Sequence, residues 1–168
     1  INASNIPQLT MGAWVKPSLA SIQSGKFLSH DNGQFDRTVG FDTRDGAGIS
    51  MFTGAGVAGN EVVPTGQWHF VAVRYDGTSA TLNVNTSQLT VADQSSDNGG
   101  EIFTQIGGNP NFNEPFIGEM DNVFFFDEAL SDAALESIRV NGVSAVPLPG
   151  ALLLVLSVVP FFRLRRAS

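Results

Sequence analysis

The sequence predicts an all-β fold, an antiparallel β-sandwich with one short helix near residues 131–140, followed by a separate C-terminal hydrophobic helix. Two observations support the prediction of a β-sandwich. Apolar and polar residues alternate with a period of two along most of the chain, as in strands with one buried face. Glycine-rich turns separate these short strands at regular spacing, which is typical of two packed antiparallel sheets.

The first predicted strand runs from residue 9 to residue 16, and a proline at position 17 ends it. Its apolar face consists of Leu9, Met11, Ala13 and Val15. Short strands follow near residues 26–29, 34–42 and 47–53. The turn formers Asp31-Asn32-Gly33 and Asp45-Gly46 separate them.

Residues 67–75 are apolar on both faces and therefore predict a central strand. Asp76-Gly77 turns the chain into a strand at 80–84, and residues 116–126 close the series. Residues 54–59 spell Gly-x-Gly-x-x-Gly, the dinucleotide fingerprint. That chemistry needs a helix directly afterwards, and the sequence up to Pro64 does not favour one, so we expect a flexible loop.

The short helix predicted near residues 131–140 begins at Ser131, a favourable N-cap, with Asp132 in the first turn. A run of helix-compatible residues follows, and Gly142 stands just past the end, where glycine terminates helices well.

Charge and composition exclude several classes of partner and of site chemistry. The chain carries a net charge of −7, and residues 1–146 hold six basic and sixteen acidic residues, a formal charge of −10. Such a domain is a poor partner for nucleic acid or anionic lipid and attracts cations instead. The chain has no cysteine, which excludes disulfides, thiolate metal sites and a cysteine nucleophile.

The C-terminal tail contains a proline motif, an apolar run at 150–162 and a basic end at 163–168. The run is short for a membrane span, which needs roughly 20 apolar residues. The arginines beyond it fit the cytoplasmic side under the positive-inside rule.

This order resembles the PEP-CTERM sorting tails of Gram-negative bacteria, in their Val-Pro-Leu-Pro variant. The resemblance implies an exported protein that is held in the inner membrane, cleaved by an exosortase and released to the cell surface. The recognition motif would be Val146, Pro147, Leu148 and Pro149, and the basic end Arg163, Arg165 and Arg166. Leu148 departs from the commonest form, which has Glu there. The alternative is an uncleaved single-pass anchor.

Export requires a signal peptide, and because the chain opens with Ile1, we interpret it as a fragment or a mature form.

A second resemblance covers nearly all of residues 5–140. The Trp14 strand, the Gly66–Gly77 hairpin and the Ile117–Ser131 segment are similar, in this order, to the laminin G-like, concanavalin A-like jelly-roll domains. The resemblance implies a jelly roll over residues 1–142, with a linker and sorting motif at 143–149. The family usually has a further strand before the first tryptophan strand, and without it the sheet would have an open edge.

Catalysis is not expected. Glucanases of this fold carry Glu-x-Asp-x-Glu or Glu-x-Asp-x-x-Glu on one strand. Glu119 and Asp121 begin that pattern, but Val123 and Phe124 stand at the third position. His30 and His69 lack a second ligand at metal spacing and are better interpreted as surface or core residues.

Calcium is the cofactor that the resemblance implies, held by hard oxygen ligands at one rim of the sandwich. The candidate ligands are Asp31, Asn32, Asn109 and Asn111. Equally, these residues are ordinary turn formers. Phe112, among asparagines in the second loop, is the candidate aromatic for a glycan, whereas Trp14 is better interpreted as packing.

Three function classes follow. The preferred one is a lectin-like surface module that binds glycan or exopolysaccharide with calcium support. The alternatives are a structural or adhesion protein of the biofilm matrix without a discrete ligand, and a glucanase-like hydrolase. Because one fold hosts all three, the loops decide among them.

Overall fold

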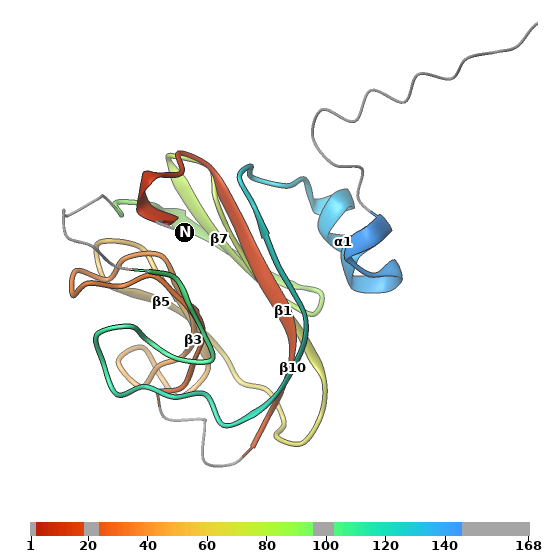
Figure 1. Cartoon of the computed structure of the whole chain (residues 1–168), viewed down its shortest axis with the longest axis horizontal. Helices are drawn as coiled ribbons and strands as arrows, with labels where there is room; N and C mark the ends of the chain where they lie inside the picture. The colour runs from red at the N-terminus through yellow and green to blue at the C-terminus, as the bar shows by residue number, and fades with distance from the viewer. Residues whose placement is uncertain (1–2, 19–23, 96–102, 146–168) are drawn as a thin grey trace, which may run out of the picture.

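The computed structural model describes residues 3–18, 24–95 and 103–145 (Figure 1). The predicted sorting motif, hydrophobic helix and basic end lie outside these residues. Within the described ranges, none of the helices has the length and apolar character needed to cross a bilayer.

Two five-stranded antiparallel sheets face each other, which confirms the predicted sandwich (Figure 1). In the first sheet the strands are ordered β10 (Gly118–Phe126), β1 (Leu9–Pro17), β6 (His69–Tyr75), β7 (Ser79–Val84) and β8 (Ser87–Ala92). In the second they are ordered β5 (Val57–Glu61), β4 (Ile49–Phe52), β3 (Thr38–Phe41), β2 (Lys26–Ser29) and β9 (Gln105–Ile106). Three short helices complete the described chain: η1 (Ala3–Asn5), α1 (Asp132–Asn141) and η3 (Val143–Ala145).

The main core lies between the two sheets. The alternating residues of β1 that the sequence assigns to one face, Leu9 to Val15, are all buried there. They meet the second sheet through residues such as Phe41 and Met51, both at most 1% exposed. Burial of these side chains is the main source of stability in a chain without disulfides.

The outer face of the first sheet is covered by α1 (Figure 1). Phe70 and Ala72 of the central strand β6 point to this side and pack with Phe124, Leu135 and other residues of a second buried cluster. Both faces of β6 are therefore apolar, as its sequence predicts. Trp14 is half-buried at the edge of this cluster, with its ring 5.7 Å from that of Phe70, which supports the packing interpretation.

Helix α1 has the predicted caps. The Ser131 hydroxyl accepts a hydrogen bond from the backbone N–H of Ala134 at 3.2 Å. At the other end Gly142 has a φ of 85° and donates its N–H to the carbonyl of Ile138.

Three sequence predictions need correction. The strand expected at 34–42 is limited to residues 38–41, because Phe35 takes a φ of 58° that breaks the extended chain. The loop expected at 54–59 is partly strand β5, which pairs with β4. Strands β8 and β9 had no counterpart in the predicted series.

Candidate functional site

Two loops that the sequence singled out for their oxygen atoms meet at one rim of the sandwich. The first joins β2 to β3, and the second joins β9 to β10. The side-chain amide of Asn109 connects them: its Nδ2 donates to Asp31 Oδ2 at 2.9 Å and to Glu114 Oε2 at 2.8 Å. Asn111 Nδ2 donates to the backbone carbonyl of Asp31 at 3.0 Å.

The structure thus brings together three of the four predicted calcium ligands, namely Asp31, Asn109 and Asn111. The fourth, Asn32, lies in the same loop and donates its backbone N–H to Asp36 Oδ2 at 3.2 Å. The loop is fixed locally, because Asp31 Oδ1 accepts from the N–H of Gly33 at 2.8 Å.

Glu114 is a site residue that the sequence prediction missed. It is the only carboxylate among residues 107–114, and this was the signal that could have identified it. With Asp31 it forms a pair of carboxylates that share one amide nitrogen.

Two basic residues stand behind Glu114. Lys26 is 1% exposed, and its Nζ lies 2.7 Å from Asp42 Oδ2 and 3.9 Å from Glu114 Oε2. Arg44 contacts Asp42 with both Nε and Nη2, and its Nη2 lies 3.7 Å from Glu114 Oε1. Both cations bond to Asp42 directly, and they lie farther from Glu114, at 3.9 and 3.7 Å. Among the described residues, no cation is paired with Asp31, whose two oxygens accept from Gly33 and Asn109.

The pKa of Asp42 gives the rim a pH dependence. Burial alone would raise this pKa, but hydrogen bonds from Arg44 and Lys26 outweigh it and hold the pKa well below its usual range. The unfolded state then binds the proton more readily, so stability falls as the pH drops below about 4, the unfolded pKa. Urea unfolding across this range should show a shallower acid loss for Asp42→Asn than for the natural chain. Equal slopes would contradict the pairing.

A pocket of about 120 Å³ opens between the loops. It is lined by Asp31, Gly33, Phe35, Arg44, Phe112 and Glu114. The Phe112 ring is 46% exposed beside it, as expected for an aromatic that meets a ligand. The pocket is smaller than the roughly 300 Å³ of an ordinary small-molecule cavity, so it suits a hydrated cation or part of one sugar residue.

The residues present fit a hard cation in one respect that the structure shows. Asn109 Oδ1 is buried and has no hydrogen-bond partner among the described residues. Nitrogen and oxygen of an amide are interchangeable by a flip. Flipped, Asn109 would aim its oxygen at the two carboxylates, an arrangement that a divalent cation between them would stabilise. In the described part of the chain no three His, Cys, Asp or Glu residues gather as a metal site, so amide and backbone oxygens would have to complete the ligand set.

The acidic residues of the incomplete glucanase pattern and the two histidines have ordinary contacts. Glu119 is exposed and pairs with Lys16 Nζ at 2.8 Å, and Asp121 Oδ1 accepts from the N–H of Asn122 at 2.7 Å. Both histidines are buried: His69 Nε2 lies 2.9 Å from the carbonyl of Pro64, and His30 Nδ1 lies 3.4 Å from Thr104 Oγ1.

Solved protein structures share the fold of this chain. The chain is similar to domain 4 of AbnA, a GH43 extracellular arabinanase from Geobacillus stearothermophilus, whose structure is in complex with arabinotriose. The TM-score is 0.53 at 16% identity, over 79% of this chain and 66% of that domain, just under two thirds. It is also similar to a native heptameric SAP-like pentraxin from Limulus polyphemus, with a TM-score of 0.52 at 18% identity, over 79% of this chain and 70% of that one. Identities this low show the fold alone.

Among curated protein sequences, none matches. The Laminin_G_3 family matches residues 3–136, which include all the described strands and the first half of α1. The chain belongs to this family, the concanavalin A-like lectin/glucanases superfamily.

Proposed function

We propose that this chain is a carbohydrate-binding module and that its glycan site is the rim pocket between the Asp31 and Asn109 loops. One observation carries the proposal: two distant loops converge on a single amide between two carboxylates, beside an exposed aromatic ring. The arabinotriose complex of the arabinanase domain supports it, since that neighbour shares the fold.

Calcium would supply the link between protein and sugar. Asp31, Glu114 and the amide oxygen of Asn109 would hold it, with a backbone or Asn111 oxygen completing part of the set. When bound, calcium adds a positive charge that attracts sugar hydroxyl oxygens. The chain's own residues supply the rest: Phe112 offers a face for the sugar's C–H groups, and Arg44 offers donors at the pocket wall.

Calcium should raise the thermal midpoint of unfolding of the natural chain relative to a chelator. A ligand at 100 times its Kd stabilises the folded state by about 2.7 kcal/mol, because it binds only that state. Glu114→Gln keeps the shape of the side chain and removes its charge, so the calcium shift should disappear. Glu119→Gln, on β10 and paired with Lys16, is the matched control and should keep the shift. An unshifted natural chain would refute the calcium site.

Phe112→Ala should weaken glycan binding by about tenfold, the order of one lost aromatic contact, and leave the melting midpoint nearly unchanged. The reason is that the ring is half exposed and lies at the pocket rim. Titration calorimetry with an arabino-oligosaccharide or another binding glycan measures the first effect and calorimetric melting the second. A large loss of stability would instead make Phe112 part of the core.

We further propose that the module works at the cell surface and is not itself a hydrolase. The tail supports exosortase sorting through its Val-Pro-Leu-Pro motif and arginines, and a shortened intact mass of the surface-released chain would test the cleavage. The glucanase pattern lacks its third carboxylate, because the apolar residues Val123 and Phe124 stand at that position, and this argues against hydrolysis. An assay for reducing sugar tests this proposal: binding of a glycan with no release of reducing sugar supports a binding module, and release of reducing sugar would contradict it.

A further inference from the structure

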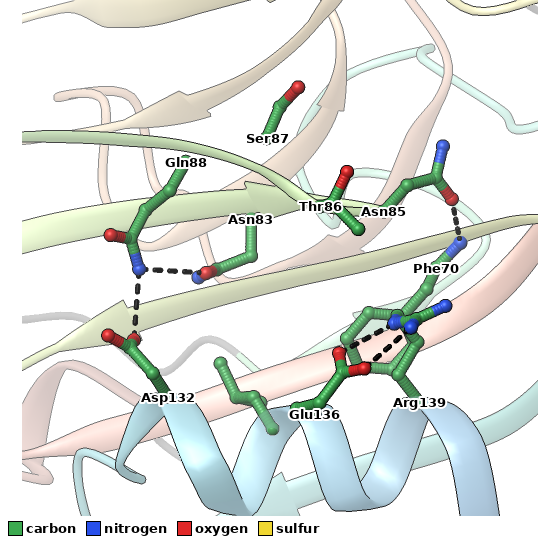
Figure 2. A pocket seen from close by; sticks show the side chains of 10 residues that line it. Phe70, Asn83, Asn85, Thr86, Ser87, Gln88, Asp132, Glu136 and Arg139 are labelled. Atoms are coloured by element: carbon green, nitrogen blue, oxygen red, sulfur yellow. Dashed lines mark hydrogen bonds and ion pairs between the residues drawn. The ribbon is translucent and has the colours of Figure 1, made fainter.

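A second pocket, of about 330 Å³, lies between α1 and the β7–β8 hairpin. Figure 2 shows the side chains that line it: those of the hairpin on one side and those of α1 on the other. Its volume is at the lower end of the range for small-molecule pockets, about 300 to 1,000 Å³. None of the residues named so far for the glycan or calcium site lines it.

The hairpin wall of this pocket is held rigidly. Asn85, at the turn, takes a φ of 52° and is bonded twice to the backbone of Phe70: its Oδ1 accepts from the N–H at 3.0 Å, and its own N–H donates to the carbonyl at 2.8 Å. The turn is thus fixed to the central strand β6, and a ligand would not have to order it.

Polar groups of both signs line the cavity and bond to one another. Gln88 Nε2 donates to Asn83 Oδ1 at 3.1 Å and to Asp132 Oδ1 at 2.9 Å, which ties the hairpin to the first turn of α1 (Figure 2). On the next turns, Arg139 holds Glu136 through Nε at 2.7 Å and Nη2 at 2.6 Å. These bonds leave Gln88 Oε1 as an acceptor and Arg139 Nη1 as a donor, without partners among the described residues.

The charges in the pocket are already neutralised. Asp132 pairs with Arg74 Nη2 at 2.6 Å, and Glu136 pairs with Arg139. A charged ligand would have to compete with these pairs, whereas hydroxyl groups can use the remaining donors and acceptors at once. Phe70 and Leu135 also line the pocket, but they are 1% and 3% exposed and so contribute only a small apolar floor.

We propose that this pocket is a second binding site, for one neutral sugar residue or a polyol of that size, and that it acts without calcium. The donors and acceptors on both walls match the hydroxyl groups of a pyranose or furanose ring, and the small apolar floor can meet its C–H groups. With the rim site, it would let one domain contact a polysaccharide at two points, which raises avidity.

The test is an amide NMR titration of the full chain with three neutral probes in the presence of a chelator: methyl α-D-glucopyranoside, methyl α-D-mannopyranoside and methyl α-L-arabinofuranoside. Shift changes should gather on residues 83–88 and 132–139 for at least one probe. Gln88→Ala should weaken that binding by about tenfold, since it removes the group that bridges hairpin and helix. Thr90→Ala, two residues along the same exposed strand, is the matched control and should change it by less than about twofold.

Three outcomes would overturn the proposal. No shift with any probe would refute the site, and shifts confined to the Asp31 and Asn109 loops would assign all sugar binding to the rim. Stronger binding of glucuronate or sulfate than of the neutral probes would refute the ligand class. Because chelator is present throughout, loss of the calcium site leaves the expected result unchanged.

Discussion

Lys26→Met is expected to lower the free energy of unfolding by about 3–5 kcal/mol, the usual cost of breaking a buried ion pair from one side. Lys26 is 1% exposed, and its ammonium group donates to Asp42 Oδ2 at 2.7 Å and to the carbonyl of Phe41 at 2.6 Å. It also lies 5.1 Å from the centroid of the Phe52 ring. Methionine fills similar space but leaves the buried Asp42 with Arg44, whose side chain is 48% exposed, as its only cation among the described contacts.

Urea denaturation at neutral pH measures this loss. The matched control is Lys16→Met, which removes a lysine from an exposed pair with Glu119 and should cost at most about 1 kcal/mol. Equal stabilities for the two variants would mean that the buried pair contributes nothing beyond a surface pair.

Phe124→Ala should cost about 3–5 kcal/mol, the range for truncating a buried phenylalanine. Phe124 is 4% exposed and stacks on Phe70, with ring centroids 6.0 Å apart, beneath α1. A Cβ at Gly12 on the neighbouring strand β1 would lie 2.5 Å from Phe124 Cζ and 2.6 Å from the carbonyl oxygen of Val71, so the ring and the β6 backbone together leave room only for glycine. Removing the ring would leave a cavity between the first sheet and the helix.

The same denaturation experiment checks this prediction, with near-ultraviolet circular dichroism to follow the aromatic packing. Phe125→Ala, at the adjacent half-buried position that points to the other side, is the control and should cost clearly less. A loss below about 1 kcal/mol for Phe124→Ala would show that α1 is not anchored through this cluster.

Strands with a regular pattern were predictable from sequence, and the others were not. The alternation in β1 and the two apolar faces of β6 follow from period two, and Ser131 and Gly142 mark the ends of α1. Strand β5 has no such pattern, because three glycines fall within residues 54–59. One of them, Gly59, takes a φ of 98°, and a Cβ there would also lie 2.7 Å from Leu82 Cδ2. The strand at this position forms through its pairing with β4, which the local sequence does not indicate.

The rim site was predictable only in part, because some of its contacts arise only when distant segments of the chain meet. Turn formers placed Asp31, Asn109 and Asn111 on loops, and the structure joins those loops. The contribution of Glu114 depends on a contact with Asn109 that the sequence does not reveal. The pocket beside α1 was not predictable, since it forms where a hairpin and a helix 44 residues apart at Gln88 and Asp132 come together.

The most direct test of a calcium-supported glycan site at the rim is a glycan array probed with the natural chain in calcium and again in chelator. The account predicts binding to at least one glycan in calcium that weakens on chelation and with Glu114→Gln. If the folded chain bound no glycan in either condition, the carbohydrate-binding function would be contradicted and a structural role in the surface matrix favoured.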